Sequence, residues 1–129
     1  MYRTRFAALA LVALVAAAPA QAATEQAFTP AAFAKAQAEG KPILVDVAAW
    51  WCPVCASQNR TVQRLTASPA YAKLTIFKIN YDNQKPEWRA LGAAKQGTLI
   101  GFRGKRETER VAFETDEAKI DHLLKTLAN

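Results

Sequence analysis

A continuous apolar run followed at once by two cysteines constrains the fold more than any other feature of the sequence. Residues Ile43 to Ala48 have the length and the β-branched content of a strand that is buried on both faces of a sheet. Cys52 and Cys55 come next, and they are the only cysteines of the chain. Pro53, between them, suits the first turn of a helix. We therefore expect a strand, a tight connection and a helix whose N-terminus carries a redox dithiol.

The rest of the pattern predicts an α/β fold with a mixed central sheet and helices on both faces. Helix N-cap and turn signals alternate with apolar, β-branched runs in the order helix, strand, helix, strand, helix, strand, strand, helix. A crossover between the first two strands makes them parallel, and the final hairpin adds an antiparallel edge. The expected helices are 30–39, 53–65, 86–93 and one beginning near 117; the expected strands are 43–48, 74–81, 97–102 and 108–113.

The first 22 residues have the pattern of a secretory signal peptide. Arg3 and Arg5 precede an alanine-rich apolar run, and Ala20-Gln21-Ala22 offers small residues at the positions that a signal peptidase reads. The apolar run breaks at Pro19 and is shorter than the roughly 20 residues of a membrane span. We expect residues 1–22 to be removed, leaving residues 23–129 as one periplasmic or secreted domain without stable membrane insertion. Retention as an anchor is the alternative, and it would change the location but not the chemistry.

The charge pattern does not suggest a nucleic-acid partner. The formal net charge is +6, and removal of Arg3 and Arg5 leaves about +4. Basic residues alternate with acidic ones, as in residues 105–110, which is typical of a solvated surface.

The spacing of the cysteines suits a reversible switch better than a structural staple. Disulfides form and persist in exported proteins. A bridge across only two intervening residues constrains the unfolded chain little. Cys52 would lie at a helix N-terminus, where free N–H groups and the helix dipole favour a thiolate, so we expect it to be the nucleophile and Cys55 the resolving thiol. Asp46 interrupts the preceding strand; it could lie at a frayed end of the strand or meet water, but the cost of burying an acid favours a functional carboxylate.

Several features in the right order make the chain similar to the thioredoxin superfamily over nearly all of residues 23–129. Trp51 precedes the cysteine pair, Asp46 stands six residues before Cys52, and Lys78 lies in a later strand. Residues 97–102 match a further strand of the family. Lys41-Pro42-Ile43 and the approach to Cys52 resemble the exported branch, which includes the C-terminal domain of periplasmic disulfide reductants.

The resemblance implies disulfide exchange with protein thiols or disulfides and with a redox partner protein. It implies no cofactor beyond the redox-active disulfide and no metal. Asp46 would accept the proton of Cys55, with Lys78 modulating it. The substrate-binding residues would be Trp51, Pro53, Val54, Gln96 and Gly97.

One position departs from the family pattern. The family has a cis-proline just before the later strand, and this chain has Gly97 there. A cis bond before a residue other than proline costs about 2.5–4 kcal/mol. We therefore expect a trans bond or a glycine with positive φ.

The sequence leaves the direction of exchange and two other functions open. Pro53-Val54 offers no positive charge or second donor to a thiolate, and the Asp46–Lys78 pair resembles reducing thioredoxins, which favours a reductase or exchange role. A binding module with a vestigial dithiol is one alternative. A metal-binding dithiol is the other, but zinc needs four ligands and this chain offers only Cys52, Cys55 and His122.

Overall fold

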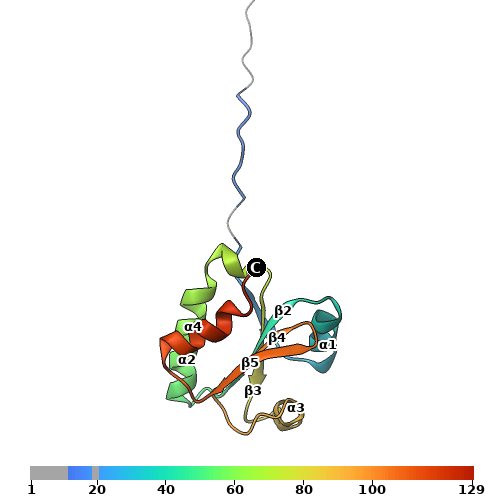
Figure 1. Cartoon of the computed structure of the whole chain (residues 1–129), viewed down its shortest axis with the longest axis vertical. Coiled ribbons are helices and arrows are strands. Elements are labelled where there is room, and N and C mark those ends of the chain that lie inside the picture. The colour runs from blue at the N-terminus through green and yellow to red at the C-terminus, as the bar shows by residue number, and fades with distance from the viewer. Residues whose placement is uncertain (1–11, 19–20) are drawn as a thin grey trace, which may run out of the picture.

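The computed structural model describes residues 12–18 and 21–129 of the chain. Residues 12–18 have no regular secondary structure and extend away from the domain (Figure 1). Much of the predicted signal peptide, residues 1–22, lies outside the described residues, so its removal stays a prediction. Within the described ranges, no helix has the length and apolar character needed to cross a membrane.

Five strands, four α-helices and one short 3-10 turn make up the described domain. In chain order these elements are β1 (Thr24–Ala27), α1 (Pro30–Ala38), β2 (Pro42–Ala48), α2 (Pro53–Thr66), the 3-10 turn η1 (Pro69–Tyr71), β3 (Thr75–Asn80), α3 (Lys85–Ala90), β4 (Thr98–Arg103), β5 (Arg106–Ala112) and α4 (Glu117–Lys125).

The strands form one mixed sheet in the order β1-β3-β2-β4-β5. The pairs β1–β3 and β2–β3 are parallel, whereas β4 and β5 run antiparallel to their neighbours. The predicted parallel pair and terminal hairpin are therefore both present. The strand with the apolar run, β2, is central, and all but the last of its residues are buried.

Helices cover both faces of the sheet, as the sequence predicts (Figure 1). Phe33 of α1 and Trp88 of α3 pack in one apolar cluster with Val45 and Phe77 of the sheet. On the opposite face, the apolar sides of α2 and α4 pack over Leu44 and Leu99 in a second cluster. The two clusters hold β2 rigidly between them, so the segment that follows β2 starts from a fixed point.

The sequence prediction missed β1 and misplaced two element boundaries by more than one residue. All four residues of β1 are exposed and mostly polar, so the strand has no apolar alternation and is held by its pairing with β3. The predicted helix 86–93 ends at Ala90 because Gly92 adopts φ +74° and terminates it. Strand β5 begins at Arg106, two residues before the predicted start.

Candidate active site

The dithiol lies at the N-terminus of α2, where β2 and a tight connection deliver it. Cys52 is the N-cap residue of α2, and its Sγ accepts a hydrogen bond from the backbone N–H of Cys55 at 3.1 Å. The two cysteines form a disulfide, and their Cα atoms are 5.2 Å apart. The side chains are similarly buried, at 3% and 4% exposed, so position and not exposure distinguishes them. Cys52 lies at the N-terminal end of α2, and Cys55 lies one turn further along the helix.

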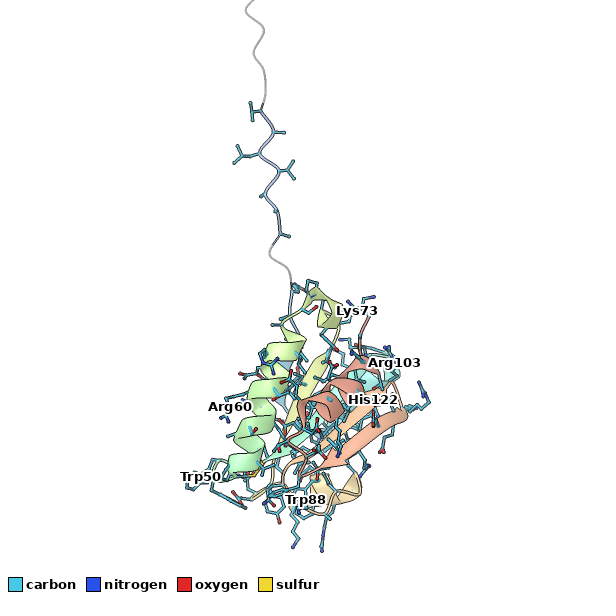
Figure 2. All side chains as sticks on the ribbon, turned by 60° about the vertical axis from the view of Figure 1, so that its left-hand side comes forward. Trp50, Arg60, Lys73, Trp88, Arg103 and His122 are labelled. Carbon is cyan, nitrogen blue, oxygen red and sulfur yellow. A yellow bond between two sulfur atoms is a disulfide. The ribbon has the colours of Figure 1, made fainter. Side chains whose placement is uncertain are left out.

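An open cleft of about 530 Å³ reaches both sulfur-bearing residues. Its lining combines small alanine side chains with polar ones. Trp50 stands at its edge, close to the start of α2, and points outward (Figure 2). The lining includes Ala49, Cys52, Cys55, Asn59, Lys78 and Asn80.

Asp46 and Lys78 are paired neighbours on adjacent parallel strands. Lys78 Nζ donates to Asp46 Oδ2 at 2.6 Å and to Asn59 Oδ1 of α2 at 2.9 Å. Its third neighbour is the carboxylate of Glu25 on β1, at 3.5 Å. Asp46 is 2% exposed, and burial raises the pKa of its carboxyl although Lys78 opposes that rise. The structure thus brings together the acid and the lysine that the sequence singled out.

Gly97 takes the positive-φ conformation expected at this position. Its φ is +74°, and the described residues contain no cis peptide bond. The N–H of Gly97 donates to Val47 O at 2.7 Å, and its carbonyl accepts from Phe113 N at 2.8 Å and from Gln58 Nε2 at 2.9 Å. These bonds use the donor and both acceptor sites of the residue. Gly97 therefore has no free backbone hydrogen-bonding group to offer a substrate.

Phe113 stands over Gly97. A Cβ atom at Gly97 would lie 3.2 Å from Cδ2 of the Phe113 ring. Phe113 itself has φ +57°, a conformation that bulky residues rarely adopt. Phe113 is 43% exposed, and Lys95 Nζ lies 4.2 Å from the ring centroid. The ring and the amide oxygen of Gln58, which would lie 3.5 Å from that Cβ, border the space that a side chain at Gly97 would enter.

Two of the three tryptophans belong to the surface near the dithiol. Trp51 is 45% exposed, and its indole N–H donates to the Asp82 carboxylate at 2.9 Å. Trp50 is 91% exposed. Trp88 is buried, and it stacks on Tyr81 with ring centroids 5.1 Å apart.

The described part of the chain shows no cluster of three or more metal-ligating side chains. His122 lies on α4, exposed, with Nδ1 2.8 Å from Glu109 Oε2. It takes no part in the dithiol site, so the ligand set considered for a metal does not come together within one chain.

Sequence reasoning missed four residues of this site: Glu25, Gln58, Asn59 and Phe113. Gln58 and Asn59 stand three and four positions after Cys55, and that helical spacing could have placed them on its face of α2. Nothing in the polar sequence of β1 indicates that Glu25 lies beside Lys78. Phe113 had been expected only as the end of a strand.

Comparison with known proteins identifies the family. No protein-family model matches the chain. A curated thioredoxin from Alicyclobacillus acidocaldarius subsp. acidocaldarius is 31% identical over 83 residues, which are 64% of this chain and 78% of the relative. The chain belongs to the thioredoxin family. With the Cys52–Cys55 disulfide at the start of α2, this thioredoxin-family protein is a thiol-disulfide oxidoreductase.

Solved structures agree with that assignment. Trxlp from Edwardsiella tarda EIB202 is 42% identical, with a TM-score of 0.73, and the match covers 78% of this chain and 98% of that one. The thioredoxin Mala s 13 from Malassezia sympodialis also has a TM-score of 0.73 over 88% of this chain and 97% of its own. Its identity is 17%, so it supports the fold alone.

Proposed function

We propose that this thioredoxin-family protein reduces disulfides of exported proteins, with Cys52 as nucleophile and Cys55 as resolving thiol. The Cys52 thiolate attacks a partner disulfide, one partner sulfur leaves as a thiolate, and a mixed disulfide forms. Cys55 then loses its proton to Asp46 and attacks Cys52 Sγ, which releases the second partner thiolate. The partner gains two electrons, the protein is left with its disulfide, and the dithiol of a redox partner protein reduces it again.

The surroundings of Cys52 Sγ support the proposed direction of exchange, which is reduction of the partner disulfide. Its one hydrogen bond within residues 12–18 and 21–129 comes from the Cys55 N–H, and no basic side chain in those ranges bonds to it. Strong oxidants of this kind owe their potential to a stabilised reduced form. The limited support for a thiolate at Cys52 therefore favours a reductant or an exchange catalyst.

Exposed aromatic side chains favour a protein as the partner. In the folded domain, residues 21–129, the large apolar side chains that are exposed are Trp50, Trp51 and Phe113. The two tryptophans directly precede Cys52. Phe113 packs against Gly97, whose carbonyl accepts a hydrogen bond from Gln58 of α2. Exposed apolar groups confined to one end of a molecule are typical of a contact surface for another protein.

The N-terminal sequence supports an exported location. Arg3, Arg5 and the apolar run that ends at Pro19 form a pattern that export machinery reads. We expect Ala23 as the first residue of the mature protein. Amino-terminal sequencing that found Met1 on the exported protein would favour an anchored form instead.

A comparison of rates in the two directions tests the proposed role. We expect the reduced protein to accelerate insulin reduction in dithiothreitol far more than the oxidised protein accelerates disulfide formation in a reduced, unfolded protein. A Cys52→Ser/Cys55→Ser variant provides the background rate in both assays. Faster oxidation than reduction would contradict the proposal, and a failure in both directions would favour a binding module.

A further inference from the structure

Lys78 is held by acceptors from three different elements. The ammonium has three N–H donors. Their neighbours are Asp46 Oδ2 of β2 at 2.6 Å, Asn59 Oδ1 of α2 at 2.9 Å and Glu25 Oε1 of β1 at 3.5 Å. The Lys78 side chain is 32% exposed and that of Glu25 is 38% exposed, whereas Asp46 is 2% exposed. The cluster therefore runs from a buried acid to an acid at the surface, with the lysine between them.

The two oxygens of Asp46 have different surroundings. Oδ2 accepts the hydrogen bond from Lys78. Oδ1 is buried and has no hydrogen-bond partner among the described residues. A carboxylate that keeps one oxygen on a lysine and leaves the other unpartnered has a site for one incoming proton. We assign Oδ1 as the atom that would receive it.

The same cleft connects this cluster to the dithiol. Cys52, Cys55, Asn59 and Lys78 all line it, and its volume of about 530 Å³ has room for several waters. The cleft thus joins Cys55 to Lys78, which donates to Asp46; Asp46 itself does not line the cleft. Glu25 reaches the cluster from the outer strand of the sheet, without lining the cleft.

We propose that Glu25 is a positioning residue of the exchange reaction: with Asn59 it holds the Lys78 ammonium, and its charge sets how readily Asp46 takes the proton of Cys55. The inference rests on the proposed role of Asp46 as the proton acceptor. The proposal gives a function to β1. All four residues of this strand are exposed, so burial of its side chains does not account for the strand.

The charges around Asp46 give the sign of the effect. The Lys78 charge lowers the pKa of Asp46, and the Glu25 charge raises it together with burial. The other neighbours are uncharged: α2 contributes Asn59 and Cys55, the latter uncharged as a thiol, and β4 places Leu99 opposite Asp46. Loss of the Glu25 charge stabilises the Asp46 carboxylate and lowers its pKa.

The test is the pH dependence of the resolving step in the full exported domain. Cys52 is first joined to a model peptide through a mixed disulfide, and release of the peptide thiol is followed across pH. Resolution needs the Asp46 carboxylate, so its rate falls on the acid side of the Asp46 pKa. We expect Glu25→Gln to move this acid limb to lower pH and to leave the rate of Cys52 attack unchanged.

Glu39→Gln is the matched control. Glu39 is similarly exposed, at 40%, and pairs with Lys41 at the end of α1, outside the cluster. It should reproduce the wild-type profile. Infrared titration of the Asp46 carboxyl in the oxidised protein gives a second readout, which a merely structural role of Glu25 would not move, and it should show the same downward shift in the Glu25→Gln variant.

Asp46→Asn separates the two ways in which the inference could fail. A general base typically contributes about 10²–10⁴-fold to a rate, so we expect this variant to slow resolution by about 10²-fold or more. An unchanged rate would overturn the role of Asp46 on which the inference rests. If Asp46→Asn slows resolution but Glu25→Gln keeps the wild-type pH profile, the role proposed for Glu25 itself is overturned.

Discussion

Gly97 stands at the position where the sequence resemblance predicts a cis-proline. The backbone turns there through a left-handed conformation and not through a cis bond. Three hydrogen bonds to Val47, Phe113 and Gln58 hold that conformation, and the Phe113 ring fills the adjacent space. Gly97 and Phe113 together thus form one wall beside the N-terminal part of α2.

Substitution of Gly97 should destabilise the protein. In Gly97→Ala, the left-handed conformation costs about 1–2 kcal/mol, and the new Cβ pushes against Phe113. Gly97→Pro should cost more, because proline requires φ near −65° and removes the N–H that bonds to Val47. Urea denaturation measures both losses.

Gly40→Ala is a control for the backbone term alone. Gly40 has φ +69°, and a Cβ there would meet nothing within 4 Å. Gly97→Ala should therefore be less stable than Gly40→Ala by the cost of moving Phe113. A Gly97→Pro variant as stable as wild type would show that the site accepts the family's proline, against this description of the wall.

At the scale of elements, α2 organises the site. Its first turn carries both cysteines, and Gln58 and Asn59 in its next turn reach the surrounding strands and loops. The buried Gln58 amide donates to the carbonyls of Gly97 and Glu114, each at 2.9 Å. One side chain of the dithiol helix thus fixes the Gly97 loop and the corner between β5 and α4.

We call the two hydrogen bonds from the Gln58 amide the Gln58 clamp. Replacement of Gln58 by methionine, which has a similar volume, tests it. Both carbonyls lose a donor, and we expect the free energy of unfolding to fall by about 1–3 kcal/mol. Hydrogen exchange of the Phe113 amide should also accelerate, because its acceptor loop loosens. Gln63→Met, at an exposed position of the same helix, removes only a 3.5 Å hydrogen bond to Glu25 Oε2 and should leave exchange at Phe113 unchanged. Unaltered exchange at Phe113 in the Gln58 variant would refute the clamp.

The sequence predicts elements well where apolar periodicity or capping residues mark them. The central strand β2 is an apolar run, and the N-caps Thr29 and Asp116 each accept the expected backbone hydrogen bond. The edge strand β1 has neither signal, since its order comes from backbone pairing with β3. The position of the Phe113 ring could not be predicted either, because it depends on a long-range contact with Gly97 and not on local sequence pattern.

At the scale of the whole molecule, stability and chemistry occupy different regions. Two apolar clusters on opposite faces of the sheet stabilise the fold, and a small third cluster contains the cysteines. The exposed aromatic side chains of the domain gather near that third cluster. Within residues 21–129, the exposed large apolar side chains are thus Trp50, Trp51 and Phe113, apart from the two large apolar clusters.

The standard reduction potential of the Cys52–Cys55 pair tests the central claim most directly. Equilibration with glutathione or dithiothreitol buffers, read by the mass of alkylated protein, gives this value. Proteins of this kind span from about −270 mV for reductants to about −120 mV for strong oxidants. With one backbone N–H supporting Cys52 Sγ, we expect a potential in the lower half of that range. A value near −120 mV would show that the reduced form is strongly stabilised and would contradict the reductase assignment.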